Sequence, residues 1–512
     1  MAMMNNQNNY SSKNKRIAKN TVLLYIRSFI VMIVALYTSR VILKALGVED
    51  YGLFNAVGGV VGLFAFLRSS MTKSTQRFLN FEMAKPNGRL KETFSVSLTI
   101  HVFLALIALI LAETIGLWFL NTYIQIPDGR NVAANMVYQG TVISLVFTII
   151  SVPYSASIIA HEKMGFFALV SVIDAFLKLA ICYLILIGDR DRLIVYGWLM
   201  MGVNVLNFVL YAFYCKKRCP ETSFRLLFNK ELMKEMLGYT TWTVVGQVAI
   251  VGTNQGTGIL MNMFHSVTAN AALGVASQVN NAVLSLTSNF QTAFNPQITK
   301  SYAAKDYDYL KFLVFSTSKI SYMLLIFVMV PIAFNIDTIL DLWLEVVPQH
   351  SASFVLLIFG NTLLNAMSAP FNYTVLSSGK IKRFQIVTSI VFLSDLLFVY
   401  LLFSIGFPPE TALVVKVLIM VVILFVRVYF ANKEVPCIDG FSYFKEVALP
   451  LILSSIITVS LGLLIFSHVD NIIKRIVFTL LLTIISFLVM YYIGLNKRER
   501  SMVNNLVSKR KK

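Results

Sequence analysis

The chain carries little charge and few of the residue types from which catalytic and metal sites are built. Charged residues make up 13% of its 512 residues, against roughly 25% in soluble domains. Cys215 and Cys219 have no nearby histidine or second cysteine pair in the sequence that would complete a zinc site,. No Gly-rich phosphate loop followed by Lys-Ser/Thr is present, which excludes a built-in ATPase. We therefore predict neither an enzyme nor a metal site nor an organic cofactor.

Long apolar stretches are what the chain does contain, and there are fourteen of them. Each reaches or approaches the ~20 residues that a helix needs to cross the hydrocarbon core of a bilayer. The sequence thus predicts an all-α polytopic membrane protein with fourteen transmembrane helices. The stretches lie at 21–46, 52–69, 93–120, 132–158, 165–187, 193–214, 239–263, 270–294, 310–334, 350–377, 384–406, 409–431, 447–467 and 472–494.

Basic residues predict how these helices are oriented. When residues near a span end are counted with the adjacent loop, 33 of the 44 Lys and Arg residues fall in alternate gaps that begin with the N-terminal tail, and 6 fall in the opposite gaps. Positive charge collects on the cytoplasmic side, so both termini are predicted to be cytoplasmic. The net charge of +19 is scattered over eight short segments. This distribution indicates anionic membrane lipids as partners and argues against a nucleic acid.

Two long basic connections divide the predicted helices into lobes. We predict a cytoplasmic tail at 1–20, a six-helix lobe at 21–214, a cytoplasmic linker at 215–238 and a second six-helix lobe at 239–431. A second linker at 432–446 leads to helices 13 and 14 at 447–494 and to a basic cytoplasmic tail at 495–512. Ala-Leu-Gly-Val follows the first span at 45–48 and recurs in the seventh-to-eighth span region at 272–275. Duplicated six-helix halves are a common construction in transporters.

One short motif gives a resemblance to a known family. Residues 46–53 read Leu-Gly-Val-Glu-Asp-Tyr-Gly-Leu, which resembles the Leu-Gly-x-x-x-Tyr-Gly signature of Wzx-type polysaccharide-unit flippases. These belong to the multidrug/oligosaccharidyl-lipid/polysaccharide (MOP) exporter superfamily. An Arg within the first span and the arrangement of six, six and two helices also match. The resemblance implies a two-lobed transporter that moves undecaprenyl-pyrophosphate-linked oligosaccharides across the bacterial inner membrane, from the cytoplasmic to the periplasmic leaflet.

Ionisable residues inside the spans are candidates for the transport site, because each costs roughly 2.5–3.5 kcal/mol to insert. Asp174 and Lys178 lie four residues apart on one helical face, either as a self-neutralising pair or facing a wet cavity. Asp395 either pairs with Lys416 of the next span or binds a coupling ion, H+ or Na+, as Asp174 would.

Two further cations lie about two helical turns from the cytoplasmic side. Arg27 and Lys319 either extend to the lipid headgroups or line a vestibule that attracts a pyrophosphate. We predict that Arg27, Lys178 and Lys319 contact the phosphates.

Spans seven and eight are unusually polar, and lipid-facing helices do not tolerate so many hydrogen-bonding side chains. We expect their amides to bind sugar. The predicted sugar-binding residues are Gln247, Asn254, Gln255, Gln278 and Asn281.

The sequence therefore predicts a flippase that works by alternating access, for O-antigen, capsule or exopolysaccharide biosynthesis. Its expected partners are the lipid-linked oligosaccharide and, beyond it, a polysaccharide polymerase and glycosyltransferases. Two alternatives stay open, a peptidoglycan-precursor flippase and a cation-coupled multidrug exporter of the MATE type. A membrane-embedded glycosyltransferase would need paired catalytic carboxylates, and the acidic residues near 337–345 read more simply as one helix face.

Overall fold

The computed structural model describes residues 2–62, 65–85, 87–123, 126–187, 190–222, 229–265, 267–344, 347–466, 472–496 and 499–500, and these residues form helices without a strand. They divide into two compact units, Met1–Val244 and Val245–Lys512. Parts of two predicted segments, the linker 215–238 and the tail 495–512, lie outside the described residues.

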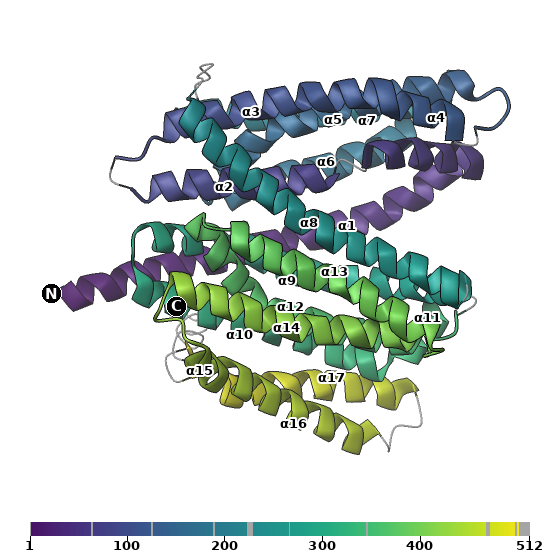
Figure 1. Ribbon diagram of the computed structural model, residues 1–512. Coiled ribbons are helices and arrows are strands. Elements are labelled where there is room, and N and C mark those ends of the chain that lie inside the picture. The colour runs from purple at the N-terminus through teal and green to yellow at the C-terminus, as the bar shows by residue number, and fades with distance from the viewer. Residues whose placement is uncertain are drawn as a thin grey trace. The chain divides into compact units, whose positions relative to one another are not determined.

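Unit 1 is a bundle whose central helix is α5. Pairs of helices that are distant in sequence run side by side within it (Figure 1). α5 packs against α7, α3, α2 and α1, and α6 packs against α1 and α7. The elements are α1 (Ala2–Gly62), α2 (Ala65–Met83), α3 (Leu90–Leu111), the π-helical turn η1 (Ala112–Gly116), α4 (Leu117–Tyr123), α5 (Asn131–Ala160), α6 (Met164–Leu184), α7 (Arg192–Arg218), η2 (Pro220–Thr222) and the first part of α8 (Lys230–Phe264).

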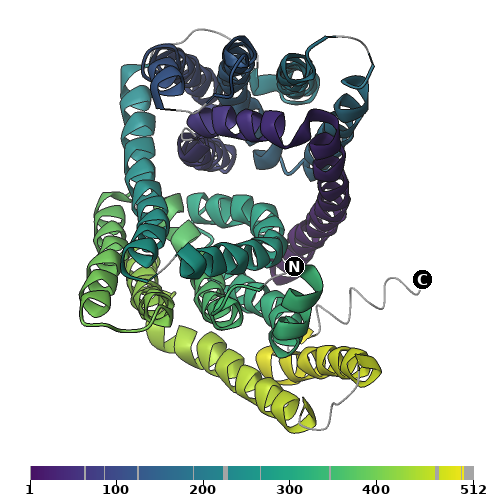
Figure 2. The ribbon, with the colours of Figure 1, turned by 90° about the vertical axis from the view of Figure 1, so that its right-hand side faces the viewer.

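Unit 2 is a bundle with α12 at its centre and a helix pair at one edge. α16 and α17 contact each other and both pack on α10, and they form the yellow-green and yellow pair of Figure 2. The elements that follow α8 are α9 (Val267–Ala303), α10 (Tyr307–Phe334), α11 (Ile336–Trp343), α12 (Ser351–Ser378), α13 (Lys382–Ser404), α14 (Glu410–Glu434), α15 (Gly440–Tyr443), η3 (Phe444–Ala448), α16 (Leu449–Phe466), α17 (Ile472–Val489) and η4 (Met490–Gly494).

The two units repeat one packing pattern. In unit 1, α5 contacts α7, α3 and α2, and in unit 2, α12 contacts α14, α10 and α9. These helices come in the same order along the two halves of the chain. The repeated pattern supports the internal duplication that the Ala-Leu-Gly-Val echo predicts.

The signature motif marks a break in α1. Gly47 has φ +81° and ψ 171°, a backbone conformation that L side chains rarely adopt. The helical path therefore stops and restarts at this glycine. Three residues later, Asp50 forms ion pairs with Arg130, which also binds Asp191 at the N-terminus of α7. We call Asp50, Arg130 and Asp191 the carboxylate clamp.

The clamp joins three segments that are distant in sequence at one end of unit 1. The Nε of Arg130 donates to Asp50 at 2.8 Å, and Asp191 also caps α7 by accepting from the backbone amides of Leu193 and Ile194 at 3.0 and 3.2 Å. Burial opposes ionisation of Asp191, but the hydrogen bonds from Arg130 and from the two amides outweigh it and lower its pKa,. The same two carboxylates raise the pKa of Arg130. The signature thus has a structural role. Gly47 interrupts α1, and the ion pair of Asp50 with Arg130 holds the chain in place after the interruption.

The number of spans differs from the prediction. Within the described residues, eleven helices are long and apolar enough to cross a membrane, so the count of fourteen is not confirmed. The three predicted spans that do not qualify are 52–69, 239–263 and 270–294. The last two form α8 and α9, with 35 and 37 residues, so composition and not length excludes them. Their polar side chains are the ones for which we predict a role in binding.

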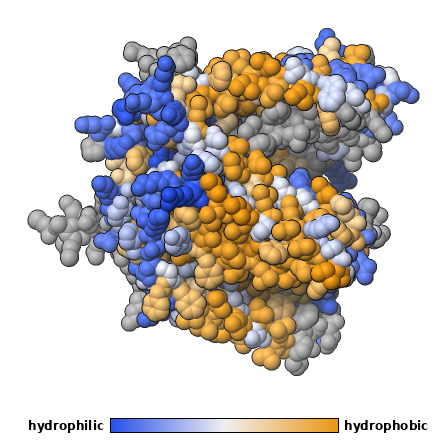
Figure 3. All heavy atoms as spheres, viewed as in Figure 1, coloured by the Kyte–Doolittle hydropathy of each residue, from blue (hydrophilic) through white to orange (hydrophobic). Residues whose placement is uncertain are grey.

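Large apolar side chains stay exposed along the helices, as expected where lipid is the solvent. Phe103 and Ile110 of α3 are 63% and 61% exposed, and Phe425 of α14 is 66% exposed. Figure 3 shows hydrophobic side chains gathered over the middle of the helices and hydrophilic ones toward their ends. Together with the eleven apolar helices, this surface is that of a multi-pass membrane protein.

Cysteine labelling tests the orientation, which rests on the charge count. A membrane-impermeant maleimide added to intact cells with a permeable outer membrane is expected to modify cysteines placed at Asp128, Arg190 and Val347. It is expected to miss cysteines at Lys85 and Lys230, which lie in loops predicted to be cytoplasmic. The parent chain with its four native cysteines gives the baseline. The reverse labelling pattern would overturn the predicted orientation.

Candidate transport site

A polar cavity lies in unit 2 between α9 and α12. Its volume is about 380 Å³, and seven of its nine lining residues carry a hydroxyl or an amide. Because neutral donors and acceptors suit a sugar chain, the wall has the chemistry of a saccharide site. None of its nine lining residues carries a charge. They are Asn281, Leu284, Ser285, Thr287, Ser288, Gln291, Thr362, Asn365 and Ala366.

A buried arginine contacts one of the residues that line this cavity. Arg427 of α14 is 7% exposed, and its Nη1 donates to Asn365 Oδ1 at 2.9 Å and to Ser368 Oγ at 2.6 Å. Since the Asn365 oxygen accepts from Arg427, the amide nitrogen of Asn365 is the group left to donate toward the cavity. No carboxylate lies within ion-pair distance of Arg427 among the described residues. The positive charge is therefore not neutralised by a neighbouring acid.

Arg427 was not among the residues predicted from the sequence. The charge count assigned it to the loop after the twelfth span, because it lies four residues before the predicted end of that span at residue 431. The structure corrects this assignment, since α14 continues to Glu434 and Arg427 is buried within it. Its position inside the predicted span was the signal that could have found it.

The predicted amides have different surroundings. Of the predicted sugar-binding residues, only Asn281 lines the unit 2 cavity. Gln247 is half-buried and Asn254, Gln255 and Gln278 are exposed within unit 2. Lipid does not solvate exposed amides, and Asn254 has a protein partner, since its Oδ1 accepts from Lys416 at 3.0 Å.

Asp395 is fully buried within unit 2. Its exposed fraction is 0%, and neither carboxylate oxygen has a hydrogen-bond partner in the described part of the chain. The ammonium of Lys416 donates to Asn254 Oδ1 at 3.0 Å and lies beyond ion-pair distance of Asp395. The Asp395–Lys416 salt bridge that the sequence allowed is therefore not formed. An ionised carboxylate is costly in such a place.

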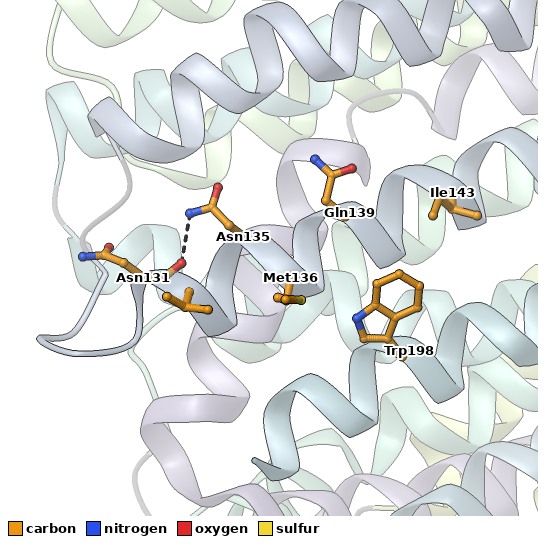
Figure 4. Close-up of a pocket in the computed structure, with 7 residues that line it drawn as sticks. Asn131, Asn135, Met136, Gln139, Ile143 and Trp198 are labelled. Atoms are coloured by element: carbon orange, nitrogen blue, oxygen red, sulfur yellow. Dashed lines mark hydrogen bonds between the residues drawn. The ribbon is translucent and has the colours of Figure 1, made fainter. Parts of the chain in front are cut away.

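A groove in unit 1 offers a second set of amides (Figure 4). Asn131, Asn135 and Gln139 lie four residues apart on one face of α5, and the indole of Trp198 comes from α7. The volume is about 640 Å³. Asn135 donates to the carbonyl of Asn131 at 2.9 Å, and Gln139 donates to Glu113 at 3.0 Å. These residues were not predicted from the sequence, although their four-residue spacing was readable.

Arg27 of α1 is held by an aromatic ring. Its guanidinium carbon lies 5.1 Å from the centre of the Phe167 ring on α6, a cation–π contact. Its Nε is buried and has no hydrogen-bond partner among the described residues. A cation held by a ring keeps donors for an anion, which agrees with the predicted role of Arg27 without testing it.

The predicted pair on α6 is formed. The ammonium of Lys178 lies 2.8 Å from Asp174, and Asn207 of α7 donates to the other carboxylate oxygen at 2.7 Å. Both charged side chains are half-buried, at 34% and 23% exposure. The neighbouring helix thus supports the self-neutralising pair, and the phosphate and ion-coupling roles of the two residues stay predictions.

Lys319 has an acidic partner that was not predicted from the sequence. Its ammonium is buried and lies 3.0 Å from Glu499, whose other carboxylate oxygen accepts from Ser316 at 3.1 Å. This ion pair fastens the start of the C-terminal segment to α10. It occupies the ammonium for which we predicted a phosphate ligand.

The structure places a histidine beside one of the cysteines, which the sequence did not predict. Folding brings His161, at the end of α5, next to Cys219 and Glu221 at the end of α7. The histidine is 58 positions away from Cys219 in the sequence, so proximity along the chain gave no sign of it.

Comparison with known proteins gives the fold. No family model matches the sequence, and no curated protein matches it. Solved structures do match. An outward-facing multidrug resistance MATE family transporter of the MOP superfamily aligns with a TM-score of 0.70 at 12% identity, over 84% of this chain and 97% of that one. The chain has the fold of MOP-superfamily transporters.

Two further structures have the same fold. A MATE structure in the straight conformation aligns with a TM-score of 0.69 at 14% identity, over 83% of this chain and 97% of that one. A MOP superfamily transporter from Pyrococcus furiosus aligns with a TM-score of 0.68 at 13% identity, over 82% and 96%. For that transporter, the reverse polarity of the binding pocket suggests a different function. At these identities the likeness concerns the fold alone.

Proposed function

We propose that this protein is a flippase that moves a polyprenyl-pyrophosphate-linked oligosaccharide across the bacterial inner membrane by alternating access. The observation that carries the proposal is the unit 2 cavity, where seven lining residues carry an amide or a hydroxyl and none carries a carboxylate. Arg427 donates to Asn365 of this lining and has no acidic partner among the described residues. An anionic sugar-bearing headgroup needs such neutral donors together with a positive field. An organic cation would instead meet repulsion from Arg427.

The unit 1 groove supports the sugar part of the proposal. Three amides on α5 and the face of Trp198 supply the hydrogen bonds and the stacking surface on which saccharide recognition relies,. Arg27, in the same unit, is the cation we assign to the phosphates. Asp174 and Lys178 are a neutral pair and add no net charge to this unit.

A second part of the proposal concerns the driving force. Outward movement of the negative headgroup gains ~2.3 kcal/mol per charge for each 100 mV of an inside-negative potential. Asp395 is the carboxylate we propose to couple transport to protons, because it is fully buried and lacks a partner among the described residues. A polysaccharide polymerase and glycosyltransferases would act on the cargo after and before this step.

Export of organic cations is the second candidate function, and the MATE fold favours it equally. The buried Asp395 would then bind the coupling ion or the cation. A peptidoglycan-precursor flippase would share the anionic lipid cargo, with a peptide attached to the sugar.

A transport assay separates the three candidates. In proteoliposomes, we expect the protein to move a fluorescent polyprenyl-pyrophosphate oligosaccharide to the leaflet where a soluble quencher reaches it. Unlabelled oligosaccharide lipid should compete, and a peptidoglycan precursor should compete less. In parallel, cells that express the protein should retain ethidium as cells without it do. Ethidium extrusion without movement of the glycolipid would refute the proposal in favour of cation export.

A further inference from the structure

We propose that His161, Cys215, Cys219 and Glu221 form a binding site for one Zn2+ ion at the end of unit 1 where α5 and α7 terminate. This site is separate from the cavities described above. It lies on the last residues before the connection to α8.

The geometry of three of these residues points to a metal. One ligand atom from each of His161, Cys219 and Glu221 lies within 4.8 Å of those of the other two. In a tetrahedral zinc site, bond lengths of about 2.0–2.3 Å place the ligand atoms about 3.3–3.8 Å apart. Small side-chain rotations would therefore bring the three atoms onto one ion.

Cys215 supplies the fourth ligand. It precedes Cys219 by one helical turn, and its thiol donates to the carbonyl of Tyr154 at 3.4 Å. Neither cysteine forms a disulfide, and both are buried, at 0% and 1% exposure. Two cysteines separated by two to four residues are the usual half of a zinc site. With the Cys215 thiol rotated from this carbonyl toward Cys219, two sulfurs, one nitrogen and one carboxylate would complete a tetrahedral set of ligands.

The surrounding hydrogen bonds already orient the ligands. His161 Nδ1 lies 3.0 Å from the Ser157 carbonyl. A carbonyl only accepts, so Nδ1 carries the proton and Nε2 carries the lone pair that a metal binds. Ser157 Oγ donates to Glu221 Oε1 at 2.8 Å, so the second carboxylate oxygen is available to an ion. Both contacts are of the kind that supports metal ligands from outside.

The charge of the group favours a bound cation. Glu221 is 4% exposed, and His161 Nδ1 lies 3.4 Å from its carboxylate. A divalent ion would balance the buried carboxylate and the thiolates, with the thiol protons released on binding. Thiolate with imidazole selects zinc over magnesium or calcium. The ion would join the end of α5 to the end of α7.

Metal titration of the full chain in detergent tests the site. After removal of metal with a chelator, we expect wild-type protein to bind one Zn2+ per chain by elemental analysis. Co2+ in place of Zn2+ should give the absorption of a tetrahedral ion with thiolate ligands. Cys219→Ser should abolish this spectrum, and Ser157→Ala should weaken binding about tenfold, as loss of an outer contact does. Cys182→Ser and Cys437→Ser are the matched controls and should bind as wild type does.

The wild-type spectrum keeps the test decisive even if Cys219→Ser fails to fold. A chelated wild-type protein that binds no Zn2+ and gives no thiolate–cobalt absorption overturns the proposal. Equal loss of binding in Cys182→Ser also overturns it, because that cysteine lies within α6, away from the four ligands. The outcome is independent of the cargo, so it leaves the proposed flippase function untouched.

Discussion

Replacing Arg427 with Met is expected to reduce movement of the lipid-linked oligosaccharide by about ten- to a hundredfold, the range that corresponds to the loss of one hydrogen bond to a charged group. Arg427 positions the Asn365 amide and brings a positive charge next to a cavity whose lining residues carry none. The substitution leaves no acid without a partner, so the variant should reach the membrane at wild-type abundance. Transport in proteoliposomes and protein abundance by immunoblot give the two measurements.

Two control variants make the Arg427 result specific. Arg427→Lys keeps the charge but loses the planar fork, and we expect it to restore part of the transport. Arg475→Met removes an arginine of unit 2 that contacts Thr338 and not the cavity, and it should transport as wild type does. Full transport by Arg427→Met would remove this residue from the mechanism.

Asp395→Asn is expected to lower export to the level of cells without the protein while the chain still folds and inserts. Lys416 keeps its hydrogen bond to Asn254 in this variant, so its ammonium still has an acceptor. If Asp395 carries the coupling proton, the residual movement in proteoliposomes should no longer respond to a pH gradient. Flux at imposed gradients of both signs is the measurement.

The double variant Asp395→Asn/Lys416→Met distinguishes coupling from charge pairing. A carboxylate that served only to neutralise Lys416 would become dispensable once the lysine is removed. We expect no rescue, because the two groups lie beyond ion-pair distance. Recovery of export in the double variant would assign Asp395 a structural role and leave proton coupling without a candidate in unit 2.

Apolar runs and their spacing predict the helices well, because a helix that is solvated by lipid must be apolar along its whole length. The same rule explains the disagreement at 239–263 and 270–294. α8 and α9 are long enough to span a membrane but carry many polar side chains, for which we predict a role in binding, so a criterion of composition does not count them. The polar composition of α8 and α9, which departs from that of lipid-facing helices, is the feature from which we predict their role in binding.

Ion pairs among the candidate residues were predictable only where both partners lie on the same helix. The Asp174–Lys178 pair follows from a spacing of four residues, whereas the partner of Lys319 is Glu499, 180 positions away. Arg427 was not predicted as a site residue, because it lies close to the end of a predicted span and was counted with the adjacent loop. The amides of α5 have a readable spacing, but only the fold places Trp198 beside them. Contacts between distant segments depend on packing that a single sequence does not encode in any local pattern.

The carboxylate clamp constrains the order in which the chain matures during synthesis. Arg130 lies 80 positions after Asp50 and 61 before Asp191. At about 5–20 residues per second, the ribosome needs roughly 7–30 s to pass from Asp50 to Asp191. During that interval Asp50 cannot yet form the complete clamp with Arg130 and Asp191. These two partners precede the fourth and sixth predicted spans, which are synthesised after the first two. A chain that stalls before Asp191 would therefore present an unlocked N-terminal hairpin to membrane proteases, whereas the full-length chain would not.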